Sequence, residues 1–250
     1  MLADLIGRLD VQVFNYVESQ TTDGDRRSLL AVHGAIARAG PFSYLEIGSY
    51  RGGTLQAVIA DPRCTRVVSI DPRPQSQPDE RFGHPLIEYP DNSVQRMRDL
   101  LGKVPGADLA KLETIEDSTG NITPERVGRP DYCFIDGEHT RAAVRRDARF
   151  CRTIMRGEGI VVFHDLNIVE PAILDFLRET RPHRAYALQD LVFVVELGNR
   201  TLLDDPGVRG QLRPRRGWII ANHAGVAAWL VALDVRRRRR VHARATGLAG

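Results

Sequence analysis

Apolar residues recur along the chain with two periods, which divide it into helical and strand segments. Near the N-terminus they follow helical spacing, which predicts an amphipathic helix over residues 2–19 and a second helix that ends near Ala39. From residue 42 onward, short apolar runs of strand length alternate with helical segments. The predicted strands are 42–47, 66–70, 111–115, 132–135, 159–163 and 191–197, and the predicted helices are 53–59, 92–101, 141–155 and 171–179. Residues 73–90, rich in proline, are predicted to be a long loop.

Strands that alternate with helices favour parallel pairing through right-handed crossovers. The pattern therefore predicts an α/β fold with a doubly wound sheet. We assign residues 1–40 to N-terminal helices on the substrate side, 41–197 to the sheet domain and 198–250 to a basic C-terminal appendage. Ligands of such sheets bind beyond the carboxyl ends of the strands, so the chemistry is expected there.

Composition places the chain among ordinary globular proteins, with 42% hydrophobic and 27% charged residues. Cys64, Cys133 and Cys151 show no metal-binding or redox spacing, so we expect buried thiols in a reducing compartment. The first ten residues lack the basic start of a signal peptide. The sequence therefore favours a cytoplasmic location.

The net charge of +3 is unevenly distributed, because residues 209–250 contain ten Arg, no Lys and a single acid. Apolar residues 217–233 precede an arginine run at 236–240. We expect a helix packed on the domain or on a second copy of the chain, and hence a homo-oligomer. A helix lying on anionic lipid is the alternative that stays open. Nucleic-acid binding is not expected, because aromatic residues do not interleave with the basic ones.

The loop after the first predicted strand carries Gly48, Gly52 and Gly53, which let a ligand approach bare main chain ahead of a helix N-terminus. Its spacing, G-x-x-x-G-G, differs from the G-x-G-x-x-G of dinucleotide-binding loops. The carboxylate of Glu46 suits a cation, such as the ammonium group of a methionine moiety. Asp71 ends the second strand 23 residues after Gly48, where an acid can accept both hydroxyl protons of a ribose.

These two blocks, Glu46-x-Gly48-x-x-x-Gly52-Gly53-Thr54 and residues 68–71, resemble the first two motifs of class I S-adenosylmethionine-dependent methyltransferases. Residues 134–139 (FIDGEH) and 159–165 (GIVVFHD) resemble one subgroup, which includes sugar O-methyltransferases of macrolide antibiotic pathways. The resemblance covers residues 25–197. It implies a Rossmann-like, mostly parallel sheet of seven strands with helices on both faces.

The resemblance also implies the roles of individual residues toward S-adenosylmethionine. Glu46, Gly48 and Ser49 would hold the methionine end, Asp71 the ribose, and Asp117 with Ser118 the adenine. The remaining residues expected in the cofactor site are Gly52, Gly53, Thr54 and Asp136.

Acidic and histidine residues follow the fourth and fifth predicted strands. Asp136 and His139 share one loop, and Asp165 comes directly after the neighbouring strand. Two carboxylates beyond adjacent parallel strands can share Mg²⁺, which lowers the pKa of a coordinated hydroxyl. The resemblance makes Asp136 and Asp165 metal ligands and His139 the base. Two points stay open: His164 is an unusual Mg²⁺ ligand, and His139 could instead bond a backbone carbonyl.

The sequence therefore favours an O-methyltransferase that acts on a hydroxyl of a small molecule, such as a sugar or a glycosylated natural product. A nicotinamide-dependent oxidoreductase is the alternative within the same fold, and Glu46 together with the glycine spacing counts against it. A non-catalytic, membrane-associated protein with this fold is the alternative from another class. The acceptor site is expected among the N-terminal helices, the 73–90 loop and the tail.

Overall fold

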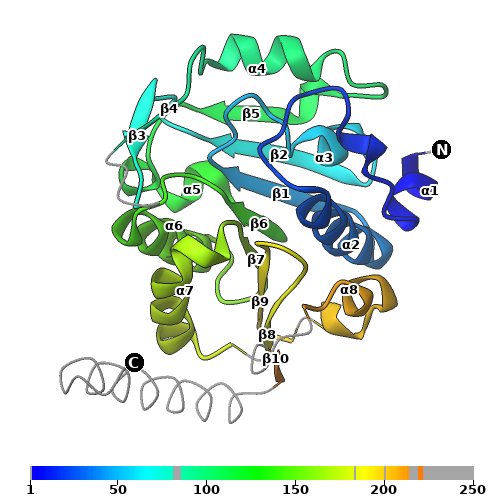
Figure 1. Ribbon diagram of the computed structural model, residues 1–250, viewed down its shortest axis with the longest axis vertical. Coiled ribbons are helices and arrows are strands. Elements are labelled where there is room, and N and C mark those ends of the chain that lie inside the picture. The colour runs from blue at the N-terminus through cyan, green and yellow to red at the C-terminus, as the bar shows by residue number, and fades with distance from the viewer. Residues whose placement is uncertain (1, 81–85, 183, 200, 214–218, 222–250) are drawn as a thin grey trace, which may run out of the picture.

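One eight-stranded sheet organises the part of the chain that the computed structural model describes, residues 2–80, 86–182, 184–199, 201–213 and 219–221 (Figure 1). The strand order is β10-β8-β9-β7-β6-β1-β2-β5. The strands are β1 (Phe42–Ile47), β2 (Cys64–Ile70), β5 (Leu112–Ile115), β6 (Tyr132–Ile135), β7 (Gly159–Phe163), β8 (Arg184–Ala187), β9 (Phe193–Leu197) and β10 (Ile219–Ala221). Seven of them form the predicted doubly wound, mostly parallel sheet, and β10 adds a strand at its edge.

The five strands β5, β2, β1, β6 and β7 are paired in parallel, and their carboxyl ends are in register. Ile47 at the end of β1 lies opposite both Ile70 of β2 and Ile135 of β6. Ile70 in turn lies opposite Ile115, and Ile135 lies opposite Phe163. The loops that follow these strands therefore start at one common edge, and β9 runs antiparallel to its neighbours β7 and β8.

Helices cover both faces of the sheet, and each face has its own buried apolar cluster (Figure 1). One face carries α2 (Asp23–Ala39), α3 (Gln56–Ala60), α4 (Val94–Leu101) and α8 (Pro206–Gly210). The other carries α5 (Pro124–Val127), α6 (Arg141–Ile154) and α7 (Leu166–Thr180). Helix α2 begins with a capping box, in which Thr22 and Asp25 satisfy each other's backbone N–H groups.

The N-terminal segment contains less α-helix than its apolar pattern predicts. Helix α1 (Leu2–Gly7) ends after six residues, and a 3₁₀ helix follows at Val11–Phe14. Between them Leu9 adopts a left-handed φ of 55°, and Asp10 caps the second helix. The prediction of one helix over residues 2–19 is wrong, because the break at Gly7 lies inside an apolar stripe that both pieces still bury.

Four other parts of the chain differ from their predicted form. The 73–90 segment contains an antiparallel ribbon, β3 (Ser76–Pro78) and β4 (Leu86–Glu88), and strand β8 has no counterpart among the predicted strands. Helix α3 starts three residues later than predicted, after a turn. Helix α7 starts at Leu166, so Pro171 lies inside it and does not begin it.

The C-terminal segment is described only in part. Residues 202–210 pack against α2, and residues 219–221 of the apolar stretch form β10, paired with β8. The rest of the stretch predicted to be a helix, and the arginine run at 236–240, lie outside the described residues. In the ranges described above, no helix combines the length and apolar character needed to cross a membrane. The three cysteines are buried free thiols.

Candidate active site

A cavity of about 440 Å³ opens beyond the carboxyl ends of the parallel strands. Loops after β1, β2, β5, β6 and β7 line it together with the start of α2 and ribbon strand β3. The sequence-predicted residues that line it are Gly48, Ser49, Gly53, Thr54, Asp71, Asp117, Ser118, Asp136, His139 and Asp165. Two predicted residues, Glu46 and Gly52, are absent from the lining.

Steric limits explain the glycine loop that follows β1. Gly48 has a φ of 85°, and a Cβ atom there would lie 2.3 Å from the carbonyl oxygen of Asp136. A Cβ atom on Gly53 would lie 2.4 Å from the carbonyl oxygen of Glu18. The loop is therefore packed tightly between the β6 loop and the segment before α2, and only glycine fits at both contacts.

Glu46 lies behind this loop and not in the cavity. Its side chain is fully buried and accepts hydrogen bonds from the hydroxyls of Tyr44, at 2.5 Å, and Thr54, at 2.7 Å. Burial raises the pKa of its carboxyl to about 8, against the lowering effect of these two hydrogen bonds. Alternation along β1 turns Glu46 to the same face as Tyr44, so a direct contact with a ligand's ammonium group does not match this placement.

Asp71, at the end of β2, is a preorganised acceptor on the cavity wall. One carboxylate oxygen accepts the backbone N–H of Tyr50 at 2.9 Å, and the other accepts that of Arg73 at 2.8 Å. The buried guanidinium of Arg73 lies 3.5 Å from the same carboxylate and also donates to Asn92 and Ser69. Sequence reasoning missed Arg73, since a charged residue in a proline-rich segment carries no sign of burial.

Asp117 and Ser118, after β5, form a turn on the same wall. The Asp117 carboxylate accepts the backbone N–H of Ser118 at 2.7 Å and the amide of Asn121 at 2.8 Å. Asp147 of α6, which sequence reasoning also missed, lines the cavity beside them and accepts the Thr119 hydroxyl at 2.5 Å. Burial raises the pKa of Asp147.

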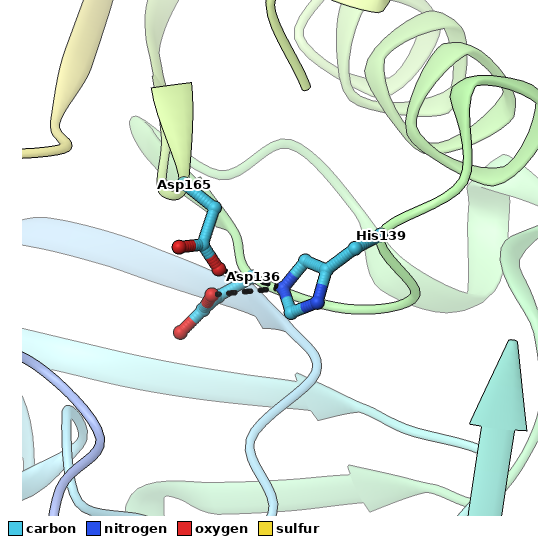
Figure 2. A group of neighbouring side chains, drawn as sticks. All are labelled: Asp136, His139 and Asp165. Atoms are coloured by element: carbon cyan, nitrogen blue, oxygen red, sulfur yellow. Dashed lines mark ion pairs between the residues drawn. The ribbon is translucent and has the colours of Figure 1, made fainter. Parts of the chain in front are cut away.

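The predicted base and metal ligands do come together. Figure 2 shows the His139 ring with one edge facing the carboxylates of Asp136 and Asp165. His139 Nε2 lies 2.8 Å from Asp165 Oδ2 and 3.9 Å from Asp136 Oδ1. Asp165 reaches this position from a left-handed backbone, with φ 53°, directly before α7. Candidate ligand atoms of the three residues all lie within 4.8 Å of one another.

The other edge of the His139 ring contacts a carboxylate that the sequence did not identify. Nδ1 lies 2.7 Å from Asp79 Oδ2, and the Asp79 side chain is fully buried. Burial alone would lower the pKa of His139, but the charges and hydrogen bonds of Asp136 and Asp165 raise it to about 10. His139 is therefore held between carboxylates and does not bond a backbone carbonyl through its ring.

His164 extends the cluster toward helix α2. Its Nδ1 lies 3.0 Å from Asp136 Oδ1, and its Nε2 lies 3.3 Å from Asp25 Oδ2. Burial opposes protonation of His164, yet the charge of Asp136 and contacts with Asp165 and Asp25 raise its pKa well above the usual value. Carboxylates and imidazoles thus alternate across the floor of the cavity, from ribbon β3 to α2.

This cluster fits a bound cation. Asp136, His139 and Asp165 place their candidate ligand atoms within 4.8 Å of one another, and their side chains are mostly shielded from water. Buried charges of one sign are costly unless they are paired or coordinate a metal. Asp136 and Asp165 line the cavity beside His139, and their carboxylate oxygens are donors that suit Mg²⁺.

Comparison with known proteins agrees with this geometry. Residues 45–166 match a family model described as a methyltransferase domain. The chain contains a methyltransferase domain. The enzyme's methyl donor is S-adenosylmethionine. The match runs from β1 to the residue after Asp165, so it covers the glycine loop, Asp71 and the carboxylate–histidine cluster.

Solved structures share the fold at low sequence identity. The O-methyltransferase NovP is 13% identical, with a TM-score of 0.54 over 79% of this chain and 98% of that one. A candidate O-methyltransferase from Klebsiella pneumoniae is 14% identical, with a TM-score of 0.51 over 80% and 90%. Cofactor-bound Rv0187 from MTB is 13% identical, with a TM-score of 0.50 over 78% and 87%. No curated protein sequence matches the chain significantly.

Proposed function

We propose that this enzyme transfers the methyl group of S-adenosylmethionine to a hydroxyl of a small molecule, a sugar or a glycosylated natural product. The observation that carries the proposal is the approach of His139 Nε2 and two carboxylates at one point of the cavity. The sequence resemblance of residues 134–139 and 159–165 to macrolide-sugar O-methyltransferases supports it. NovP, which shares the fold, is itself an O-methyltransferase.

For the cofactor we propose a revised set of contacts. Gly48, Ser49, Gly53 and Thr54 would border its methionine end, where the packed loop exposes main chain to the cavity. Asp71 would accept the ribose hydroxyls with the lone pairs that its two backbone donors leave free. Asp117 and Ser118 would border the adenine. Glu46 is assigned a supporting role, because it holds Thr54 from behind the loop.

For the chemistry we propose that His139 accepts the proton of the acceptor hydroxyl. Nε2 is the nitrogen that faces the cavity carboxylates, so the ring is oriented for this role. Asp136 and Asp165 would hold Mg²⁺, and a metal there would lower the pKa of a coordinated hydroxyl. The same carboxylates raise the pKa of His139, so a cation between them would also leave the imidazole less firmly protonated.

Binding and turnover measurements test the proposal separately. Calorimetry with S-adenosylmethionine and S-adenosylhomocysteine should show both binding, whereas NADH should not bind. A panel of sugars and glycosylated natural products, scored by S-adenosylhomocysteine release with and without Mg²⁺, should identify the acceptor. Methylation confined to amines or carbon centres would contradict the O-methyltransferase assignment.

The location and assembly of the chain also remain proposals. We propose a cytoplasmic homo-oligomer, with the division at residues 40 and 197 as its domain boundaries. Light scattering on the full chain measures the oligomeric state. Co-sedimentation with anionic vesicles, with and without residues 214–250, tests the alternative that the basic tail contacts membranes.

A further inference from the structure

A buried carboxylate at the end of ribbon strand β3, that of Asp79, contacts His139, the proposed base. Asp79 follows Pro78 at the end of β3, and its side chain is fully buried against the His139 ring. The backbones of Asp79 and His139 form an isolated parallel bridge, and the N–H of Glu80 approaches the His139 carbonyl oxygen at 3.4 Å. The ribbon is thus fastened to the histidine loop through both main chain and side chain.

This contact keeps a proton on one ring nitrogen. Asp79 Oδ2 lies 2.7 Å from His139 Nδ1, and a carboxylate can only accept, so Nδ1 is an N–H. Nε2 faces Asp136, Asp165 and the cavity, and Asp165 Oδ2, 2.8 Å away, can accept from it in the same way. When another group engages the Asp165 carboxylate, Asp79 still holds the Nδ1 proton, and Nε2 is the nitrogen that can accept one. The second hydrogen bond of a histidine fixes its tautomer in this way.

We infer that Asp79 is a positioning residue, which holds the His139 ring in the orientation and tautomer that proton removal from the acceptor requires. The inference rests on the proposed function, since it assigns Asp79 a role only through His139. Asp79 itself does not contact the reacting groups, because the imidazole ring of His139 lies between its carboxylate and the cavity carboxylates.

Exchange of the Asp79 carboxylate for an amide removes the negative charge but keeps the size and shape of the side chain. It therefore tests the effect of charge and tautomer apart from that of packing. In Asp79→Asn the amide either donates to Nδ1 through its nitrogen, which moves the ring proton to Nε2 and blocks proton acceptance, or accepts from Nδ1 through its oxygen without the negative charge. Both arrangements remove the charged hydrogen bond. The Asp79→Glu variant keeps a carboxylate and should restore part of the activity. Glu88→Gln serves as the matched control, because Glu88 is an exposed carboxylate on the other strand of the same ribbon.

The first readout needs no acceptor. In ¹⁵N-labelled full chain saturated with S-adenosylhomocysteine, the proton on His139 Nδ1 should resonate far downfield and exchange slowly. It should disappear or move far upfield in Asp79→Asn and stay unchanged in Glu88→Gln. An unchanged resonance in Asp79→Asn would overturn the inference, and so would its absence from the unmodified protein.

The second readout uses the acceptor that the screen identifies. Asp79→Asn should lower kcat by about 10- to 100-fold, the usual effect of removing a histidine's supporting carboxylate, with KM for S-adenosylmethionine nearly unchanged. In a His139→Ala background the same exchange should have no further effect, whereas a merely structural role would lower activity in both backgrounds. If Asp79→Asn is fully active and His139→Ala is inactive, the role of Asp79 is overturned while the proposed base stands. Full activity of His139→Ala overturns the proposed base and, with it, this inference.

Discussion

Two buried histidine–aspartate pairs lie at opposite ends of the sheet and have the same nitrogen–oxygen distance. His33 of α2 meets Asp61 with Nε2 and Oδ2 2.7 Å apart, near the start of β1 and β2. His139 meets Asp79 with Nδ1 and Oδ2 also 2.7 Å apart, at the carboxyl ends of the strands. Distance and burial alone would therefore assign both pairs the same role.

Their surroundings separate them. Asp61 also binds the guanidinium of Arg63 at 2.6 Å, and burial lowers the pKa of His33, so this imidazole stays neutral. His139 faces further carboxylates in place of cations, and its pKa rises to about 10. The first pair is a closed contact that joins α2 to the sheet, whereas the second opens onto a cavity. The neighbours of a histidine–aspartate pair, more than the pair itself, distinguish a closed structural contact from one that opens onto a cavity.

The largest difference should appear in turnover. His139→Ala should lower kcat by about 10²- to 10⁴-fold, the range expected for loss of a general base, and should leave S-adenosylhomocysteine binding intact. His33→Ala should change kcat little, because His33 lies at the other end of the sheet. S-adenosylhomocysteine release under saturating acceptor measures both variants. Equal losses in the two would remove the functional distinction between the pairs.

Metal dependence should give the next largest difference. Asp165→Asn should weaken activity by roughly 10- to 100-fold and abolish any response to added Mg²⁺, because it removes one of two oxygen donors. The unmodified enzyme should lose activity in chelator and regain it with Mg²⁺. The control variant Asp61→Asn, at the other pair, should respond fully to Mg²⁺ when its activity is expressed per folded molecule. Turnover measured across a Mg²⁺ titration decides between these outcomes.

The stability of the fold should depend more on the His33–Asp61 pair than on the His139–Asp79 pair. His33→Ala creates a cavity and leaves the buried Asp61 without one hydrogen bond, at a cost of about 2–4 kcal/mol. That loss corresponds to a fall in Tm of roughly 5–10 °C for a domain of this size. Asp61 keeps its contact with Arg63, which limits the damage. Calorimetric unfolding of the metal-free protein measures it, and an unchanged Tm would show that this pair contributes little to the fold.

The contrast between the pairs also marks where sequence reasoning succeeds. The meeting of Asp136, His139 and Asp165 was predictable, because parallel strands bring their carboxyl ends to one edge. Asp79 and Asp25 were not, since their contacts with the histidines join loops and helices that no local pattern relates. The position of Glu46 could have been inferred from strand alternation, which groups it with Tyr44. Buried helix His33 gives no signal of a partner 28 residues away.

The smallest expected effect is on how stability depends on pH, where the two pairs should change in opposite directions. The folded pKa of His139 is raised from 6.5 to about 10, so its contribution is full below pH 6.5 and is lost as pH rises toward 10. The folded pKa of His33 is lowered, so its contribution is present above its unfolded pKa and is lost on acidification. In metal-free protein, the Tm advantage over His139→Gln should therefore shrink between pH 7 and about 10. The advantage over His33→Gln should shrink below about pH 6.5. Two advantages that change in the same direction with pH would mean that the surroundings do not distinguish the pairs.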